Sequence, residues 1–377
     1  MRTPELPKAT FVDSPKKLDE MISDLMKEPI VAVDTESNSL YAYQERVCLI
    51  QFSIPEKDFL VDPLAVSDLS ALGLLFASSE IEKIFHAAEY DLIMLDQDFG
   101  FELSNLFDTM VAARILGWKA VGLGSILQEQ FGIHVQKKYQ RANWGRRPLP
   151  EEMLTYAQLD THYLIPLRKR IKDELERTSR WPLAEEDFER GCQVNTNHNQ
   201  RDGADCWRIN GARDLRPQQL AVLQELCEYR DQIAQSTDRP LFKVINNSTL
   251  YNIAEACPRS TSELEAVKGL SHKQVRWLGR GLLSAVQRGL DAKQTPRIPH
   301  NPRPSDAYLL RVDKLRQWRK NTGRAMGVES DVVLPKDLLY EFAGTNPQTF
   351  DQVSEIMSKV PWRLAHFGNQ IFNLLNQ

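Results

Sequence analysis

The sequence predicts a mixed α/β domain, in which helices cover the faces of the sheet, followed by two all-helical bundles. Strand-like and helix-like segments alternate over the first half of the chain. The second half is helical in pattern and repeats itself, and polar or proline-rich stretches separate the parts. At 377 residues the chain is too long for one ordinary core, so several domains are expected.

The first half supplies the α/β pattern. Ser14-Pro15 predicts a helix start, with a capping hydroxyl and proline at the first helical position. Short apolar runs follow and then alternate with helical patterns. In order, we expect strands over 30–34, 47–54 and 58–62, a strand over 83–87, a helix over 89–98, a short strand near 105–107, a helix over 109–117 and one long helix from Pro150 to about Arg177. Meandering strands followed by β-α-β units give a mixed sheet with helices on its faces.

The second half contains an internal repeat. Two pairs of segments match at an offset of 89 residues, namely 226–232 with 315–321 and 244–254 with 333–343. A third pair, 264–270 with 350–356, matches at an offset of 86, which predicts a loss of three residues. The polar stretch 191–205 and the stretch 291–307, with four prolines, are expected to be linkers. The expected domains are therefore 1–195, 208–290 and 305–377.

Composition excludes several classes of protein. With 42% apolar and 26% charged residues, the chain has no apolar run of membrane-spanning length and no signal-peptide core at its N-terminus. Its five cysteines are scattered without a C-x-x-C motif, which argues against a disulfide scaffold and against a zinc site. We expect a cytoplasmic protein that does not enter the membrane. Nothing in the sequence points to an obligate protein partner.

Charge is divided unevenly between the two halves. Residues 1–200 carry a net charge of −10, whereas residues 201–377 carry +6. An acidic half joined to a basic half is typical of a catalytic site linked to a module that binds an anionic ligand, although such an excess is also compatible with ordinary surface.

Two carboxylates stand at the end of the first apolar run. Asp34 and Glu36 follow 30–33 and are separated only by Thr35. Residues two apart in a strand point to the same face, so both acids crowd one spot. Such a pair is unfavourable unless a cation or a shared proton compensates for the repulsion. The alternative is a strand end with solvated acids.

Two further acids complete a possible metal site. Asp91 lies at the start of the helix over 89–98, and Asp160 lies one turn after Tyr156 on a later helix. Taken alone, Asp91 could be a helix cap and Asp160 a satisfied helical acid. Together with the first pair they form an all-oxygen set that suits two divalent cations, Mg²⁺ or Mn²⁺.

These motifs resemble those of a known enzyme family. D-x-E after a strand (34–36), H-A-A-x-Y-D (86–91) and Y-x-x-x-D (156–160) resemble the three exonuclease motifs of the DEDD superfamily, and the tyrosine at 156 is typical of its tyrosine subgroup. The stretch 143–168 resembles ribonuclease D, and the two helical copies resemble HRDC domains. The resemblance covers nearly the whole chain.

The resemblance implies a fold, an activity and residue roles. The fold would be ribonuclease H-like, and the activity 3′→5′ hydrolysis of RNA with a free 3′ end, tRNA precursors being the implied substrate, to release nucleoside 5′-monophosphates. Asp34, Glu36 and Asp160 would hold one metal ion. Asp34 would also hold the second ion, with support from Asp91. Tyr156 would orient the attacking water, since a phenol with a pKa of about 10 is a poor base at neutral pH.

Five other residues are expected to contact the substrate. Relatives contact the terminal nucleotide at the position of Thr35 and wedge an apolar side chain against the last base at the position of Leu40. The basic segment 137–147 contains aromatic residues, a combination that suits a stacked single strand. We expect this set to bind substrate: Thr35, Leu40, His86, Trp144 and Arg147. Each of these expectations has an alternative. Leu40 could lie in the core, the basic segment could be a solvated loop, and His86 could be an ordinary residue at a strand end.

Three alternative functions stay open at this point. The same motifs occur in DNA 3′→5′ exonucleases, and no residue visibly reads a 2′-hydroxyl. A non-catalytic nucleic-acid-binding protein could have kept the fold, although the five motif residues are all present. A structural scaffold would leave the acids unexplained.

Overall fold

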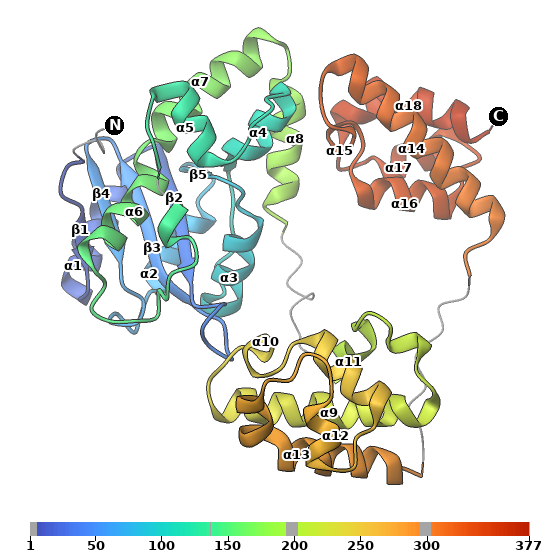
Figure 1. Ribbon diagram of the computed structural model, residues 1–377. Coiled ribbons are helices and arrows are strands. Elements are labelled where there is room, and N and C mark those ends of the chain that lie inside the picture. The colour runs from blue at the N-terminus through green and yellow to red at the C-terminus, as the bar shows by residue number, and fades with distance from the viewer. Residues whose placement is uncertain (1–5, 136, 194–202, 294–302, 377) are drawn as a thin grey trace. The chain divides into compact units, whose positions relative to one another are not determined.

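The computed structural model describes residues 6–135, 137–193, 203–293 and 303–376 (Figure 1). The chain divides into two compact units. One unit contains residues 1–37, 47–196 and 303–377, and the other contains residues 38–46 and 197–302. Each unit is described separately below.

A six-stranded mixed sheet forms the centre of the first unit (Figure 1). Its order is β1-β4-β3-β2-β5-β6. The strands are β1 (Thr10–Val12), β2 (Ile30–Ser37), β3 (Val47–Ile54), β4 (Lys57–Val61), β5 (Glu82–Phe85) and β6 (Leu106–Asp108). β2, β3 and β4 form an antiparallel meander, while β5 and β6 continue the sheet in parallel with β2, and β1 pairs in parallel with β4. The expected mixed sheet is thus present, and β1 is an addition to it.

β3 is buried along its whole length, which explains why it is apolar except at Gln51 and Ser53. Its register fixes the functional face of the sheet. Asp34 of β2 lies opposite Gln51 of β3, and Gln51 lies opposite Leu60 of β4. Residues directly opposite each other in an antiparallel pair share one face. Helix α6 lies across this face (Figure 1).

Eight helices accompany the sheet. They are α1 (Pro15–Leu25), α2 (Ser70–Ala77), α3 (Glu89–Phe99), α4 (Thr109–Leu116), α5 (Leu123–Phe131), α6 (Glu151–His162), α7 (Leu164–Arg177) and α8 (Trp181–Gly191). Helix α1 begins at Pro15 as expected, although the Ser14 side chain makes no capping hydrogen bond. Helices α5 and α8 were not anticipated, and α8 ends at Gly191, where the expected linker begins. Residues 194–202 of that stretch lie outside the described residues.

The single long helix expected over 150–177 is wrong, because the chain breaks at Tyr163 into α6 and α7. Pro166 explains the break. Proline has no N–H group, and its ring clashes with the carbonyl four residues earlier, here that of His162. A new helix instead starts one turn before the proline, with the amide of Leu167 donating to Tyr163.

The second half contains two copies of one five-helix unit. The first copy comprises α9 (Pro217–Ser236), α10 (Leu241–Val244), α11 (Asn247–Ala256), α12 (Thr261–Glu265) and α13 (His272–Asp291). The second comprises α14 (Asp306–Met326), α15 (Ser330–Val333), α16 (Lys336–Thr345), α17 (Phe350–Ile356) and α18 (Pro361–Leu375). Each helix of the second copy starts 89 residues after its counterpart, for example at Pro217 and Asp306. The predicted loss of three residues is therefore wrong.

The two copies also share internal contacts. In the first copy, Gln274 Nε2 donates to the carbonyl of Val244 at 3.0 Å. At the same positions of the second copy, 89 residues later, Arg363 Nε donates to the carbonyl of Val333 at 3.2 Å. The same bond thus ties the last helix of each copy to the end of its second helix, α10 in the first copy and α15 in the second.

Arg363 also anchors the second copy to the α/β domain. Its guanidinium is fully buried and contacts the carboxylates of Glu186 and Asp187 on α8, the latter at 2.8 Å. The amide of Trp362 donates to Glu186 at 2.8 Å. Burial raises the pKa of Glu186 even though Arg363 lies beside it. The attraction between the two charges therefore offsets the cost of removing them from water only while both partners are present.

The first copy packs against the loop over residues 38–46 in the second unit. The hydroxyl of Tyr43 donates to Asp231 at 2.9 Å, and its amide donates to Asp238 at 2.9 Å.

A disulfide joins Cys206 to Cys227 of α9, an unexpected pairing for a chain whose cysteine spacing suggested no disulfide framework. None of the described helices is long and apolar enough to cross a membrane. The expected domain limits, 1–195, 208–290 and 305–377, stay predictions.

Replacing Arg363 with Gln tests the anchor. Glutamine is the residue of the first copy at this position and can keep the bond to Val333, but it leaves Glu186 buried without its cation. Breaking a buried ion pair from one side costs about 3–5 kcal/mol, so the free energy of unfolding should fall by that order in chemical denaturation. As a control, Arg190→Gln removes an ion pair whose partner Asp337 is exposed, and should change it by at most about 1 kcal/mol. Equal decreases in the free energy of unfolding for the two variants would contradict the role of Arg363 as an anchor.

Candidate active site

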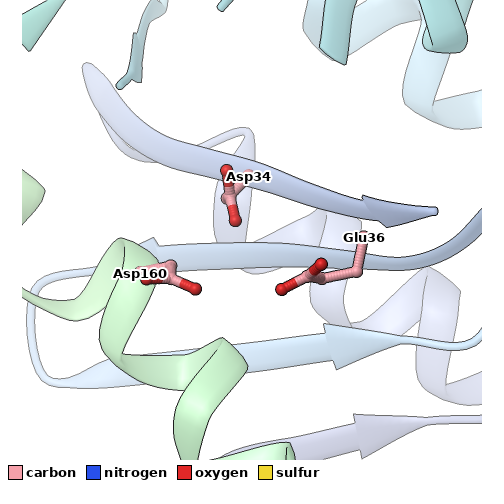
Figure 2. Close-up of side chains that lie close together, drawn as sticks. All are labelled: Asp34, Glu36 and Asp160. Carbon is pink, nitrogen blue, oxygen red and sulfur yellow. The ribbon is translucent and has the colours of Figure 1, made fainter. Parts of the chain in front are cut away.

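Three carboxylates meet where β2 and α6 face each other. Asp34 and Glu36 project from the same face of β2, as their spacing predicts, and Asp160 projects from α6 (Figure 2). One carboxylate oxygen from each residue lies within 4.8 Å of those of the other two. Asp34, Glu36 and Asp160 are called the acid cluster below.

The acid cluster is electrostatically unfavourable when no cation is bound. Burial and the neighbouring acids raise the pKa of Asp34 and of Glu36 well above the ordinary range. Burial and the charge of Asp91 raise the pKa of Asp160 to about 8. All the donor atoms are carboxylate oxygens, which suit a hard divalent cation. The donor set and the unrelieved repulsion therefore both fit a metal site.

Asp91 lies beside the acid cluster but is held separately. It sits in the first turn of α3, where its carboxylate accepts a hydrogen bond from the hydroxyl of Thr35. Burial raises the pKa of Asp91 to about 7, although the bond from Thr35 acts to lower it. Asp34, Glu36 and Asp160, three of the four acids expected from the sequence, thus meet. The fourth, Asp91, is hydrogen-bonded to β2, the strand that carries Asp34 and Glu36.

The turn that leads into α3 is fixed by Asp108, a residue that sequence reasoning missed. Its carboxylate accepts from the amides of Ala87 and Ala88 at 3.1 and 2.8 Å, and it also caps α4. Ala87 has a φ of 65°, a left-handed conformation that is unusual for alanine. The two bonds from this turn hold the strained backbone and thereby set the start of the helix that carries Asp91.

A pocket of about 570 Å³ opens over the acid cluster. Thr35, His86 and Tyr156 line it together with the three acids. His86 Nδ1 lies 2.9 Å from Thr109 Oγ1, and burial lowers the pKa of His86, so its imidazole is neutral at neutral pH. The remaining lining residues, which sequence reasoning missed, are Gly122, Leu123, Gly124, Ser125, Gln128, His134, Val135 and Gln140.

Tyr156 stands one helical turn before Asp160 and is 7% exposed. Its ring packs against those of Tyr139 and Trp144, with centroids 5.9 and 6.2 Å away. Burial, with the charges of the acid cluster, raises the pKa of Tyr156 far above the ordinary value for a phenol. The hydroxyl therefore stays protonated at neutral pH and can act only as a hydrogen-bonding group.

Two of the residues expected to bind substrate make internal contacts instead. Trp144 is 1% exposed and packs beneath Tyr156, so its indole is not available to stack on a base. The guanidinium of Arg147 donates to both oxygens of Asp62 at 2.6 Å and to the carbonyl of Cys48 at 2.7 Å. These contacts fasten the basic segment to the sheet, which a charge-and-aromatic pattern cannot distinguish from an RNA-binding surface.

Leu40 belongs to the loop over residues 38–46, which groups with the second unit, and its side chain is 37% exposed. The alternative of a core leucine therefore does not hold.

A buried polar network fastens α6 to the sheet. The carboxylate of Asp58 accepts from Ser53 Oγ and from Gln158 Nε2, both at 2.6 Å, and lies 2.8 Å from His162 Nδ1. Ser53 Oγ is also 2.7 Å from Thr161 Oγ1. Gln158 and His162 flank Asp160 on the helix, so the network sets the position of that acid. Their spacing of four residues, which places both on one face of the helix, was the available sequence signal.

Two family models match this chain. A 3′–5′ exonuclease model covers residues 9–176, and an HRDC domain model covers residues 219–286 and 309–375. The exonuclease model covers the region that contains the three carboxylate motifs, and the HRDC model covers the two helical copies.

Named relatives extend these matches. Ribonuclease D of Gluconacetobacter diazotrophicus is 30% identical over 316 residues, covering 81% of this chain and 80% of that protein. The Arabidopsis thaliana protein RRP6-like 2 is 33% identical over 299 residues and 74% of this chain, but the match spans only 34% of that longer protein. The crystal structure of Escherichia coli RNase D, described as an exoribonuclease involved in structured RNA processing, superimposes with a TM-score of 0.71 at 26% identity, covering 98% of this chain and 99% of that one. The chain belongs to the ribonuclease D family of 3′–5′ exonucleases.

Proposed function

We propose that this protein is a metal-dependent 3′→5′ exoribonuclease that removes nucleoside 5′-monophosphates from RNA ends. The observation that carries the proposal is the acid cluster at the floor of the pocket, where three carboxylates lie within 4.8 Å of one another. The ribonuclease D relatives support RNA as the substrate. Precursor tRNA as the target and the cytoplasm as the location are further proposals that rest on the resemblance.

Four acids would hold two divalent cations, Mg²⁺ or Mn²⁺. Asp34, Glu36 and Asp160 would bind one ion, and Asp34 with Asp91 would bind the other. Bound ions of this kind lower the pKa of a coordinated water and neutralise charge on a phosphate. The raised pKa values of the acids mean that they must release protons before they can bind a cation.

Tyr156 would position the attacking water. A protonated phenol can donate a hydrogen bond and accept another but cannot serve as a base, so its contribution is orientation. The aromatic packing around the ring limits its rotation and keeps the hydroxyl in place above Asp160. The network around Asp58 would act in the same sense by fixing the helix that carries both residues.

Thr35, His86 and Leu40 are the proposed substrate contacts. Thr35 and His86 line the pocket, and Leu40 has the exposure that a contact with a terminal base requires. Trp144 and Arg147 would contribute indirectly, by supporting Tyr156 and the basic segment.

The helical copies would supply additional RNA affinity. On α13 of the first copy, Lys273, Arg276 and Arg280 are exposed together with Trp277, which is 46% exposed. Basic side chains around an exposed aromatic suit a single strand. In the second copy, Arg311 and Arg319 donate to the carbonyls of Ala343 and Leu334, which makes these two side chains less available for contacts with phosphate.

Metal dependence provides the first test. Mg²⁺ or Mn²⁺ should support trimming of a 5′-labelled single-stranded RNA, and EDTA should stop it. Because the acids bind a cation only after losing their protons, the affinity for Mn²⁺ should rise from about pH 6 to about pH 8. Calorimetric titrations across this range measure the affinity, and the matched DNA strand tests substrate preference. Trimming in excess EDTA would refute the proposal.

Tyr156→Phe separates orientation from metal binding. Removing only the hydroxyl should lower the turnover rate about 100-fold or more, while the affinity for Mn²⁺ stays near that of the wild type. Tyr163→Phe is the matched control, since Tyr163 lies at the junction of α6 and α7 and its ring packs on Phe131. Single-turnover kinetics and calorimetry supply the two readouts. Wild-type turnover in Tyr156→Phe would make Tyr156 a packing residue.

The direction of attack is tested with the ends of the RNA. A pocket that receives a terminal nucleotide requires a free 3′ hydroxyl, so a 3′-phosphorylated RNA and a circular RNA should both resist hydrolysis. A 5′-phosphorylated RNA of the same sequence should be trimmed at the normal rate. Cleavage of the circle at a comparable rate would identify an endonuclease instead.

A further inference from the structure

Gln51 is a buried amide that the described structure leaves without a hydrogen bond. It lies in the middle of β3 and is 0% exposed. Neither its Nε2 nor its Oε1 has a partner among the described residues. Leaving a buried polar group unsatisfied costs about 1–3 kcal/mol, and such groups are rare in native proteins. An apolar residue here would avoid that cost, so the amide requires an explanation.

The register of the sheet points Gln51 toward the acid cluster. Gln51 lies directly opposite Asp34 on β2, with Leu60 on its other side, so all three share one face. Residues opposite each other in antiparallel strands have Cβ atoms about 4.5–5.5 Å apart. The amide of Gln51 can therefore reach the carboxylate of Asp34 after a small rearrangement of either side chain.

Helix α6 covers the same spot. Leu49, two residues before Gln51, packs in a cluster with Tyr156 and Ala157. Ser53, two residues after it, lies 2.7 Å from Thr161 on the next turn of the helix. Residues 49, 51 and 53 of a strand share one face. Gln51 consequently faces the helical turn between 157 and 161, which carries Asp160.

We propose that Gln51 is a positioning residue of the metal site, whose amide hydrogen-bonds the acid cluster when a cation is bound. This inference rests on the proposed metal-dependent function. A cation keeps the carboxylates ionised, and an ionised carboxylate accepts stronger hydrogen bonds than a neutral one. The amide N–H would donate to a carboxylate oxygen that is turned away from the ion. Groups that orient metal ligands in this way typically change metal affinity or activity 10–100-fold when they are replaced.

Gln51→Met in the full-length protein tests the proposal. Methionine keeps the unbranched shape but has neither amide donor nor carbonyl. Because the Gln51 side chain has no hydrogen-bond partner among the described residues, the melting temperature measured without added metal should stay the same or rise. The affinity for Mn²⁺ should fall about 10–100-fold, measured by calorimetry, and the stabilisation of the melting temperature by saturating Mn²⁺ should shrink. Gln51→Leu should behave in the same way and guards against an effect peculiar to methionine.

Gln219→Met is the matched control. Gln219 is also a buried glutamine, but its amide is satisfied by the carbonyl of Glu255 and by the amide of Arg216. This variant should lower the melting temperature and leave the affinity for Mn²⁺ unchanged.

The outcomes separate this inference from the proposed function. Wild-type affinity for Mn²⁺ in both Gln51 variants would overturn the role of Gln51 while leaving the metal site intact. A loss of metal-free stability in both variants, as large as that in Gln219→Met, would show that Gln51 is a packing residue and would also overturn it. No binding of Mn²⁺ by the wild type would instead refute the metal-dependent function.

Discussion

The repulsion among Asp34, Glu36 and Asp160 is the constraint on which the rest of the catalytic domain depends. Three carboxylates within 4.8 Å would move apart if the backbone allowed it. Two are fixed because they lie two residues apart on one strand, and the third is fixed because its helix is pinned to the sheet. The fold therefore holds the acids in an arrangement that bound protons or a cation must compensate, and part of its stability is spent on keeping the site ready for that cation.

Several features that look unrelated serve this constraint. The network around Asp58 ties α6 to β3 and β4 on both sides of Asp160. Arg147 and Trp144 close the segment that precedes α6, and Asp108 holds the turn that precedes α3. The network around Asp58 and the side chain of Trp144 contact α6, and Asp108 contacts the turn before α3, so these groups touch the supports of the acids rather than the acids themselves. Arg147 acts one step further away, by fastening the segment before α6 to Asp62 and Cys48. Positioning in this domain thus comes from polar contacts beneath the site.

The sequence predicted five of the six strands and the repeat because each depends on periodicity. A spacing of two along a strand placed Asp34 and Glu36 on one face, whereas joining Asp160 to them rested on the shared chemistry of the acids and on the resemblance of the motifs. Spacing along the sequence could not distinguish Arg147 or Arg363 from surface arginines, because the role of each depends on a partner 85 or 177 residues away. The break at Tyr163 was predictable in principle, since Pro166 was visible in the sequence. Gln51 was also visible, as the one amide in an apolar strand, but its meaning requires the register.

The shared bond of Gln274 and Arg363 shows how a duplicated module can acquire a new task. In both copies the side chain at this position ties the last helix to the carbonyl at the end of the second helix. Arginine keeps that bond and has donors left over, which in the second copy reach the two acids of α8. Together with the ion pairs of Arg114 with Glu329 and of Arg190 with Asp337, this exchange joins the second copy to the α/β domain. One position of a repeated module thus serves internal packing in the first copy, and both internal packing and attachment to the catalytic domain in the second.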